Sequence, residues 1–195
     1  MSSRIAVIGT GYVGLTTGVC LAHLGHYVTC ADIDADKVAR LSRGEMTIVE
    51  AGLESLLREG LATGRLRFVV GAAAAVPTCE IAFLCVPTPQ GDDGSADLSY
   101  IEAAAAEIAS TLPAGAVVVN KSTVPVGSTK VVERVLQRPD VHVVSNPEFL
   151  REGSAVSDFL KPDRVVVGAD DRAAAERVAA LYTSLGAPTI ITDPA

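Results

Sequence analysis

A short apolar run at residues 4–9 leads directly into Gly9-Thr10-Gly11-Tyr12-Val13-Gly14, and few folds accommodate that junction. The run has the length and β-branched content of a buried strand. The apolar spacing of residues 12–24 predicts a helix that Gly25 ends. Gly9 then allows a tight turn, Gly11 a close approach to the backbone, and Gly14 close packing of the helix on the strand. The chain therefore starts as the strand–turn–helix unit of an α/β fold.

The rest of the sequence continues this alternation of short β-branched runs and longer amphipathic stretches. Strands are predicted at residues 27–32, 66–70, 80–86, 116–120, 142–145, 164–168 and 188–192, and helices at 34–43, 52–62, 98–111, 128–137 and 172–184. Such alternation favours a parallel sheet covered by helices. We expect one domain over residues 1–195, a Rossmann-type α/β fold with a doubly wound, mainly parallel sheet and helices on both faces.

Composition and charge narrow the classes of protein. Hydrophobic residues make up 49% of the chain and charged residues 20%, with no long apolar run, which indicates a globular protein. The net charge is −7 and no basic cluster occurs, so neither nucleic acid nor a membrane is an expected partner. The N-terminus lacks the apolar stretch of a signal peptide, and we therefore expect a cytoplasmic protein.

The cysteines and histidines give no sign of a metal site. The four cysteines contain no CxxC pair; Cys20, Cys30 and Cys85 lie in apolar runs and are expected to be buried, and Cys79 is expected to be more exposed. The three histidines lack the spacing of metal ligands.

An acidic residue follows the glycine loop at a telling distance. Asp32 ends the second predicted strand, about 20 residues on, where a carboxylate meets the ribose hydroxyls of NAD and would repel the extra phosphate of NADP. A glycine loop alone is a common turn, but strand, loop, helix, strand and acid in this order predict NAD, with its phosphates at the helix N-terminus. Lys37 is a candidate contact on the adenosine side, and a solvated helix lysine is an equal interpretation.

Three later segments follow predicted strands at the edge where open α/β sheets bind ligands. They are Val86-Pro87-Thr88-Pro89, the KSTVPVG segment at 121–127 and the NPEFLREG segment at 146–153. Each one alone is equally an ordinary loop, because prolines and small polar residues commonly end strands. Together with GTGYVG, in this order, they resemble the N-terminal domain of the UDP-glucose dehydrogenases over the whole chain.

The resemblance implies a role for each matching residue. Those implied to contact NAD are Gly9, Thr10, Gly11, Tyr12, Val13, Gly14, Asp32, Lys37, Val86, Pro87, Thr88, Pro89, Gln90, Ser122, Thr123 and Glu152. Those implied to line the UDP-glucose substrate are Glu148, Phe149, Leu150, Arg151 and Glu152. Thr123 and Glu148 are implied to be catalytic, Thr123 holding a water or alkoxide and Glu148 transferring protons.

The family oxidises a primary alcohol of the sugar twice, with two NAD, to a carboxylate, through a thioester on a cysteine. That cysteine lies in a GGxCxPKD-like segment of a second, UDP-binding domain, and these 195 residues contain no such segment. We therefore expect a truncated chain without the family's central helix and C-terminal domain, which binds NAD but does not turn over. The full-length enzyme is expected to be a homo-oligomer, and this fragment by itself a monomer.

A smaller departure from the family is Glu50-Ala51-Gly52, where the family commonly has Glu-Pro-Gly. We expect alanine still to start the helix, after a looser loop. Two alternative functions stay open: a dehydrogenase for GDP-mannose or UDP-N-acetylmannosamine, and a non-catalytic NAD-binding module.

Overall fold

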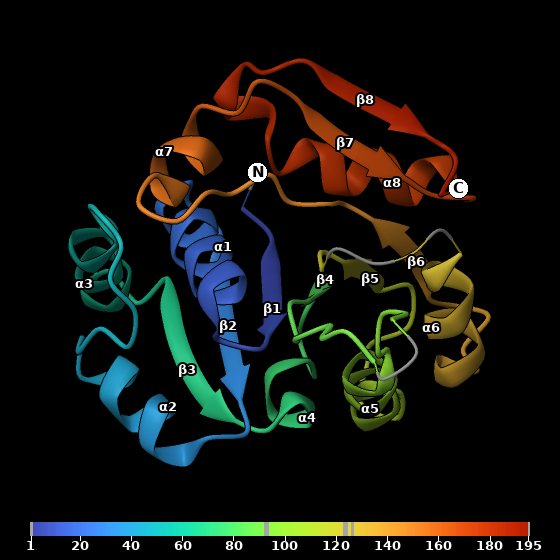
Figure 1. Ribbon diagram of the computed structural model, residues 1–195, viewed down its shortest axis with the longest axis horizontal. Coiled ribbons are helices and arrows are strands. Elements are labelled where there is room, and N and C mark those ends of the chain that lie inside the picture. The colour runs from blue at the N-terminus through green and yellow to red at the C-terminus, as the bar shows by residue number, and fades with distance from the viewer. Residues whose placement is uncertain (1, 92–93, 123–124, 126, 195) are drawn as a thin grey trace.

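One sheet forms the centre of the molecule. The computed structural model describes residues 2–91, 94–122, 125 and 127–194, and within them eight strands follow the order β3-β2-β1-β4-β5-β6-β7-β8 (Figure 1). All neighbouring strands are parallel except β6 and β7, which meet antiparallel through Ser145 and Gly168. The Rossmann-type expectation is confirmed. The strands are β1 (Arg4–Ile8), β2 (Tyr27–Asp32), β3 (Leu66–Val70), β4 (Ile81–Leu84), β5 (Val117–Asn120), β6 (His142–Ser145), β7 (Val165–Gly168) and β8 (Thr189–Thr192).

Helices cover both faces of the sheet. They are α1 (Tyr12–His23), α2 (Ala35–Ser42), α3 (Leu53–Ala62), α4 (Ala72–Ala75), α5 (Ser99–Ile108), α6 (Ser128–Leu136), α7 (Ala155–Leu160) and α8 (Arg172–Ala180), with a 3₁₀ turn at Thr183–Leu185. Residues of α1, α2, α3, α7 and α8 pack into one apolar cluster, and those of α4, α5 and α6 into the other. Figure 1 shows α5 and α6 together on one side, away from α1, α3 and α7.

The central strands are buried on both faces, which explains their continuous apolar runs. Along β1, Ile5 and Val7 belong to one cluster while Ala6 and Ile8 belong to the other. A strand that is covered on both faces keeps no polar alternation. Burial of each large aliphatic side chain contributes roughly 1.5–3 kcal/mol, so these runs hold both helical layers on the sheet.

Some expectations about local structure were wrong. The helix expected over residues 98–111 starts at Ser99 and ends at Ile108. The helix expected over residues 172–184 ends at Ala180, and the chain continues into the 3₁₀ turn. The helix expected over residues 52–62, which Ala51 was expected to start, begins at Leu53. Gly52 has a φ of 79°, and helical residues have negative φ. The short helices α4 and α7 were not expected at all, since one or two turns carry too little periodic signal.

The last strand–helix–strand unit stands apart from the parallel part of the sheet. Because β7 pairs with β6 only at the carboxyl ends of both strands, β7 runs on past the end of β6, and β8 lies beside β7 at the top of Figure 1, while α8 packs against β6, β7 and β8. The Asn146 side chain, just after β6, donates to the Val166 carbonyl at 2.8 Å. Strand β7 therefore lies beside the segment that follows β6.

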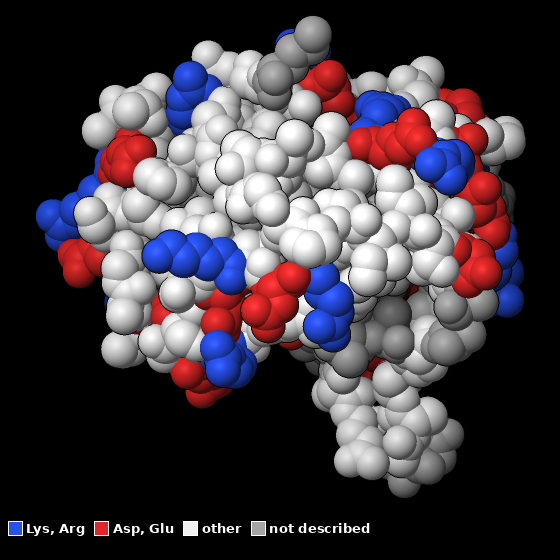
Figure 2. All heavy atoms as spheres, turned by 90° about the horizontal axis from the view of Figure 1, so that it is seen from above, with Lys and Arg blue, Asp and Glu red and all other residues white. Residues whose placement is uncertain are grey.

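Charged side chains of both signs share the surface. On the face shown in Figure 2, Lys and Arg side chains lie beside Asp and Glu side chains, and no area of basic residues alone is visible. No helix in the part of the chain that the structure describes is long and apolar enough to cross a membrane.

Candidate functional site

The carboxyl ends of the parallel strands bring the predicted loops to one edge. Strands β1, β2, β4, β5 and β6 run in the same direction, so the segments after them leave the sheet on the same side. These segments are the glycine loop (residues 9–14), Asp32, residues 85–90, residues 121–127 and residues 146–153. Ligands of open α/β sheets bind at this edge, so the topology gathers the predicted site.

Close packing fixes the shape of the glycine loop. A Cβ atom on Gly14 would lie 1.9 Å from the Gly9 carbonyl oxygen, and one on Gly9, whose φ is 95°, would lie 2.6 Å from the Cys85 carbonyl oxygen. Neither position accepts a side chain. A Cβ atom on Gly11 would meet no atom within 4 Å. The φ of Gly11 is −68°, which any residue can adopt, so neither sterics nor backbone conformation requires glycine there. The space above Gly11 is therefore free for a ligand to approach the backbone.

The first helix begins without a protein cap. Gly11, the N-cap of α1, has no side chain with which to cap the helix, and the first turn holds no acidic residue. Asp34 caps α2 by accepting from the Lys37 amide and Asp171 caps α8, whereas α3 and α6 begin, like α1, at a glycine. The amides and the positive end of the helix dipole at α1 thus stay available to an anion, which is the arrangement that phosphate groups use.

Asp32 is fixed in its ionised form beside this loop. Its Oδ2 accepts from the Thr10 amide at 3.0 Å, the Thr10 hydroxyl at 2.5 Å and Lys37 Nζ at 3.1 Å. Its Oδ1 accepts from the Asp34 amide. Burial acts to raise the pKa of Asp32, but the donors outweigh it and hold the pKa at about 2. The predicted residues Thr10 and Lys37 thus orient the carboxylate at the end of β2.

The segments after β4 and β5 are joined by one hydrogen bond. The Ser122 hydroxyl donates to the Val86 carbonyl at 2.7 Å, which brings two predicted cofactor residues together. Pro87 and Pro89 are exposed, Thr88 is half-buried, and the Gln90 side chain turns to its own loop, with Nε2 3.4 Å from the Gly94 carbonyl oxygen. The predicted catalytic residue Thr123 lies outside the described residues.

The 148–153 loop carries the predicted substrate residues. Glu148 is half-buried, and its Oε2 accepts from the Leu150 amide of the same loop at 2.5 Å. The Arg151 guanidinium pairs with Asp158 at 2.7 Å, which fastens the loop to α7. Glu152 is exposed, and its charge acts on Tyr12 of the glycine loop. The loop thus turns toward the glycine loop at one end while Glu148 stands at the other.

A hollow of about 460 Å³ borders this loop. Its charged lining comprises Arg151, Asp158, Lys161, Asp163 and Arg164, and Phe149 lies against the Arg164 guanidinium at 5.0 Å. Guanidinium and ammonium groups bind phosphate oxygens. The hollow therefore has the residues for an anionic group, next to the predicted substrate loop.

A buried lysine beneath the site was not singled out from the sequence. Lys121 is 4% exposed, and its Nζ lies 3.4 Å from Asn146 Oδ1, which also accepts from the Tyr182 hydroxyl at 2.7 Å. Burial lowers the pKa of Lys121, while the electrostatic influence of Cys85 and Glu148 acts to raise it. Only the fold brings Tyr182 to this lysine, so no spacing in the sequence could have indicated the cluster.

A second missed feature is the Glu50 carboxylate. Glu50 is buried, accepts from the Tyr12 hydroxyl, and also accepts from the amides of Gly153 and Ala155. From the sequence, Glu50-Ala51-Gly52 were considered only as the residues that precede and start a predicted helix. Its partners lie up to 105 residues away, and the pattern around residue 50 says nothing of them.

None of the four cysteines suits nucleophilic chemistry. Cys20, Cys30, Cys79 and Cys85 are all free and buried, and burial raises the pKa of each thiol, to about 12 for Cys20, Cys79 and Cys85. The expectation of a more exposed Cys79 was wrong, because Cys79 packs into the apolar cluster under α4 and α5 and is 4% exposed. No group of three or more His, Cys, Asp or Glu residues suited to a metal ion occurs among the residues with described positions.

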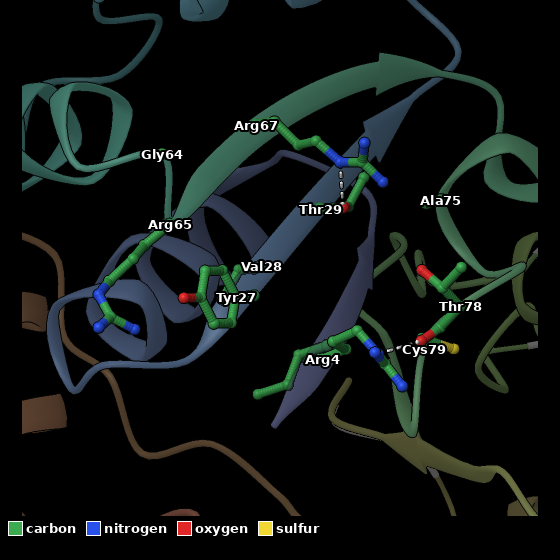
Figure 3. A pocket seen from close by; sticks show the side chains of 11 residues that line it. Arg4, Tyr27, Val28, Thr29, Gly64, Arg65, Arg67, Ala75, Thr78 and Cys79 are labelled. Atoms are coloured by element: carbon green, nitrogen blue, oxygen red, sulfur yellow. Dashed lines mark hydrogen bonds between the residues drawn. The ribbon is translucent and has the colours of Figure 1, made fainter. Parts of the chain in front are cut away.

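Another hollow, of about 250 Å³, lies at the opposite edge, near the amino ends of β1 and β2. Figure 3 shows Arg4 and Arg67 beside it; Arg67 Nε donates to the Thr29 hydroxyl at 2.7 Å, and Arg4 Nε to the Thr78 carbonyl at 2.9 Å. None of the predicted site residues lines this hollow. The predicted site residues with described positions therefore lie away from this hollow.

Comparison with known sequences decides the family. A sequence model of the UDP-glucose/GDP-mannose dehydrogenase family, for its NAD binding domain, matches residues 3–186. The chain belongs to this family. Its cofactor is NAD, as the family's NAD binding domain requires, and the glycine loop, the uncapped α1 and Asp32 fit that cofactor.

Individual relatives and solved structures agree with this membership. The UDP-glucose 6-dehydrogenase of Pseudomonas aeruginosa is 48% identical over 187 residues, which cover 92% of this chain and 41% of that protein. The structure of a UDP-glucose dehydrogenase from Pyrobaculum islandicum superposes with a TM-score of 0.93 at 42% identity, over 100% of this chain and 47% of the other. The GDP-mannose dehydrogenase of Pseudomonas aeruginosa gives 0.91 at 35% identity, over 97% and 46%. The chain thus spans less than half the length of these dehydrogenases.

Proposed function

We propose that this chain is the NAD-binding part of a UDP-glucose 6-dehydrogenase, the enzyme that oxidises UDP-glucose to UDP-glucuronate. The observation that carries the proposal is the position of the Glu148 loop beside the glycine loop, on one sheet edge of a chain that is 48% identical to such an enzyme. The substrate assignment is a proposal about the whole protein, of which this chain forms one part.

We assign the cofactor contacts as follows. The amides at the start of α1 bind the phosphates over Gly11, and the Asp32 carboxylate accepts hydrogen bonds from the adenosine ribose hydroxyls. Tyr12 and Val13, in the first turn of α1, contact the cofactor beside Gly11. Glu152, which is exposed on the 148–153 loop, contacts it from the other side. The residues after β4, from Val86 to Gln90, and Ser122 and Thr123 after β5 hold the nicotinamide side.

Glu148 is the proposed general base. NAD held by these residues would supply the hydride acceptor for each of two successive oxidations at one sugar carbon. Glu148 takes the proton that leaves the hydroxyl group and releases it to solvent. In the final hydrolysis it takes a proton from the water that the Thr123 hydroxyl orients, as that water attacks the thioester and the C–S bond breaks to release the thiol. Acid–base catalysis needs such a group within hydrogen-bond reach of the proton, and Glu148 stands at the sheet edge where the sugar would lie.

The nucleotide sugar lies along the 148–153 loop in this proposal. The hollow beside Phe149 and Arg164 takes an anionic phosphate group, with Arg151 and Lys161 at its rim. The thiol that carries the acyl intermediate comes from outside these 195 residues, because all four cysteines here are buried with raised pKa. Residues 1–195 then form a single domain, and the central helix and the UDP-binding domain belong to the rest of the enzyme.

The proposed setting is a homo-oligomer in the cytoplasm. The four free thiols suit a reducing compartment, in which unpaired cysteines persist. The likeness to GDP-mannose dehydrogenase, at 35% identity, supports one alternative substrate, GDP-mannose.

The test is a substrate comparison with the full-length protein that contains this chain. NADH formation is followed with UDP-glucose, GDP-mannose and UDP-N-acetylmannosamine at about millimolar concentration. We expect UDP-glucose to give the highest kcat/KM and two NADH for each sugar consumed. Higher kcat/KM with either other sugar contradicts the substrate, and NAD binding without any oxidation contradicts the enzymatic role.

A further inference from the structure

Glu50 is a buried carboxylate without a cationic partner. It lies between α2 and α3, is 8% exposed, and takes part in none of the ion pairs formed by the described residues. Removing an ion from water without compensation is unfavourable, so buried charges in proteins are held by hydrogen bonds or by opposite charge. Glu50 depends entirely on hydrogen bonds.

Its donors come from the two loops of the proposed site. Oε2 accepts from the Tyr12 hydroxyl and from the Gly153 amide at 2.8 Å, and Oε1 accepts from the Ala155 amide at 3.0 Å. Tyr12 is the first residue of α1, directly after Gly11. Gly153 and Ala155 follow Glu152 at the start of α7. One carboxylate therefore joins the glycine loop to the end of the 148–153 loop.

The chemistry of these partners calls for an anion. All three are donors, and the hydrogen bonds from Tyr12 and the amides outweigh burial and lower the pKa of Glu50. A glutamine would turn its own amide hydrogens toward at least one of these donors and leave it without an acceptor. A side chain that only filled space between the loops would need no charge.

Tyr12 connects the Glu50 carboxylate to the glycine loop. Its hydroxyl also lies 3.1 Å from the Arg151 carbonyl oxygen, so it contacts both Glu50 and the 148–153 loop. Burial, together with the hydrogen bond to Glu50 and its charge, raises the pKa of Tyr12 to about 12, which keeps the phenol protonated and donating. In the fold, α1 contacts both α3 and α7, and Figure 1 shows the three helices at one end of the sheet.

We propose that Glu50 is a positioning residue that couples the two ligand loops: through Tyr12 it transmits the binding of NAD at the glycine loop to residues 148–155, which become more ordered. This inference rests on the proposed function, since it concerns the loop assigned there to the substrate. Ordering one loop before the sugar arrives lowers the conformational entropy that sugar binding must overcome, and the two ligands then bind cooperatively.

Three variants of the chain separate coupling from simple stabilisation. Tyr12→Phe breaks the link to the glycine loop but leaves Glu50 bonded to Gly153 and Ala155. Glu50→Gln disturbs both sides. Glu54→Gln is the matched control, because Glu54 is exposed and pairs only with Arg58 on the surface of α3.

The readout is amide hydrogen exchange over residues 148–156, with and without NAD at a concentration that saturates each variant. We expect NAD to slow exchange there about fivefold or more in the wild-type chain and in Glu54→Gln, the range of typical allosteric coupling. In Tyr12→Phe and Glu50→Gln the effect of NAD should fall below about twofold. If Glu50→Gln does not fold, Tyr12→Phe alone tests the inference, because in that variant Glu50 keeps its hydrogen bonds to the amides of Gly153 and Ala155.

Two results overturn the inference: an unchanged effect of NAD in Tyr12→Phe, and no effect of NAD in the wild-type chain. A role limited to capping α7 predicts the first of them. Neither result depends on turnover or on which sugar is used, so this test and the substrate comparison can fail separately. In the full-length protein, UDP-glucose should also lower the Kd of NAD about fivefold or more, and Tyr12→Phe should abolish that change.

Discussion

The site has two sides: the glycine loop with Asp32, and the 148–153 loop with Glu148. The hydrogen-bond partners of the first side are nearer in the sequence than those of the second. Asp32 is held by Thr10, 22 residues earlier, and by Lys37, five residues later. The 148–153 loop is held by Glu50, 103 residues before Gly153, and Asn146 beneath it by Tyr182, 36 residues later. The first side is a rigid local unit, whereas the second takes its shape from the assembled fold. We therefore expect changes on the first side to affect cofactor binding and changes on the second to affect chemistry.

The largest expected effect is on turnover. In the full-length protein, Glu148→Gln should lower kcat about 10²–10⁴-fold, the usual contribution of a general base. The Kd of NAD should change little, since among the described residues Glu148 hydrogen-bonds within its own loop, to the Leu150 amide. Steady-state kinetics and calorimetry measure both quantities. Wild-type turnover in this variant would remove Glu148 from the mechanism. A large loss of NAD affinity would contradict the division between a cofactor-binding side and a catalytic side.

Two glycine substitutions test the rigid side. Gly14→Ala should lower the free energy of unfolding by about 3 kcal/mol or more, because its Cβ would lie 1.9 Å from the Gly9 carbonyl oxygen. Gly11→Ala should leave stability within about 0.5 kcal/mol, because its Cβ meets no protein atom, and should weaken NAD binding about tenfold. Denaturant unfolding and calorimetry separate the two. Equal stability losses would mean that the space over Gly11 is not kept for a ligand.

Acid should affect the rigid side through Asp32. Its pKa falls from 3.8 to about 2 on folding, and its side chain is 12% exposed, so its ionised form contributes roughly 2 kcal/mol to stability. Because the folded-state pKa is the lower one, this contribution is present above pH 4 and is lost as the pH falls through about 2. Asp32→Asn should therefore be less stable than wild type at pH 6 and approach it toward pH 2, as followed by urea unfolding.

The control for that experiment is Asp36→Asn, since Asp36 is exposed on α2. Its stability relative to wild type should stay nearly constant over the same pH range. A constant difference for Asp32→Asn as well would show that its hydrogen bonds do not favour the ionised form.

The smallest effect is expected beneath the 148–153 loop. Lys121 is buried beside Asn146, Phe159 and Tyr182 with no carboxylate within ion-pair distance among the described residues. Replacing a buried ion by an apolar side chain of similar volume is often neutral or stabilising, so Lys121→Met should change the free energy of unfolding by about 1 kcal/mol or less, or raise it. A loss of several kcal/mol would show that the ammonium group is essential to the fold.

The same contrast explains what could be predicted from the sequence. The strand, the glycine loop and Asp32 follow from local patterns, because backbone sterics and strand length fix where each lies. The antiparallel β7, the short α7 and the Glu50 link do not, because they depend on pairings between residues that only the folded chain brings together. Cys79 was misjudged for the same reason: α4, which covers it, carries too few residues to be predicted.

The central claim is that the glycine-loop side is built in advance for NAD, with Asp32 selecting it. Calorimetry of NAD and NADP with the wild-type chain and with Asp32→Ala tests this most directly. We predict tighter binding of NAD than of NADP in the wild type, and a loss of roughly 1.5–3 kcal/mol of NAD affinity in Asp32→Ala, since hydrogen bonds to a charged group have this strength. Equal affinity for the two cofactors in the wild type, or unchanged NAD affinity in Asp32→Ala, would contradict the account.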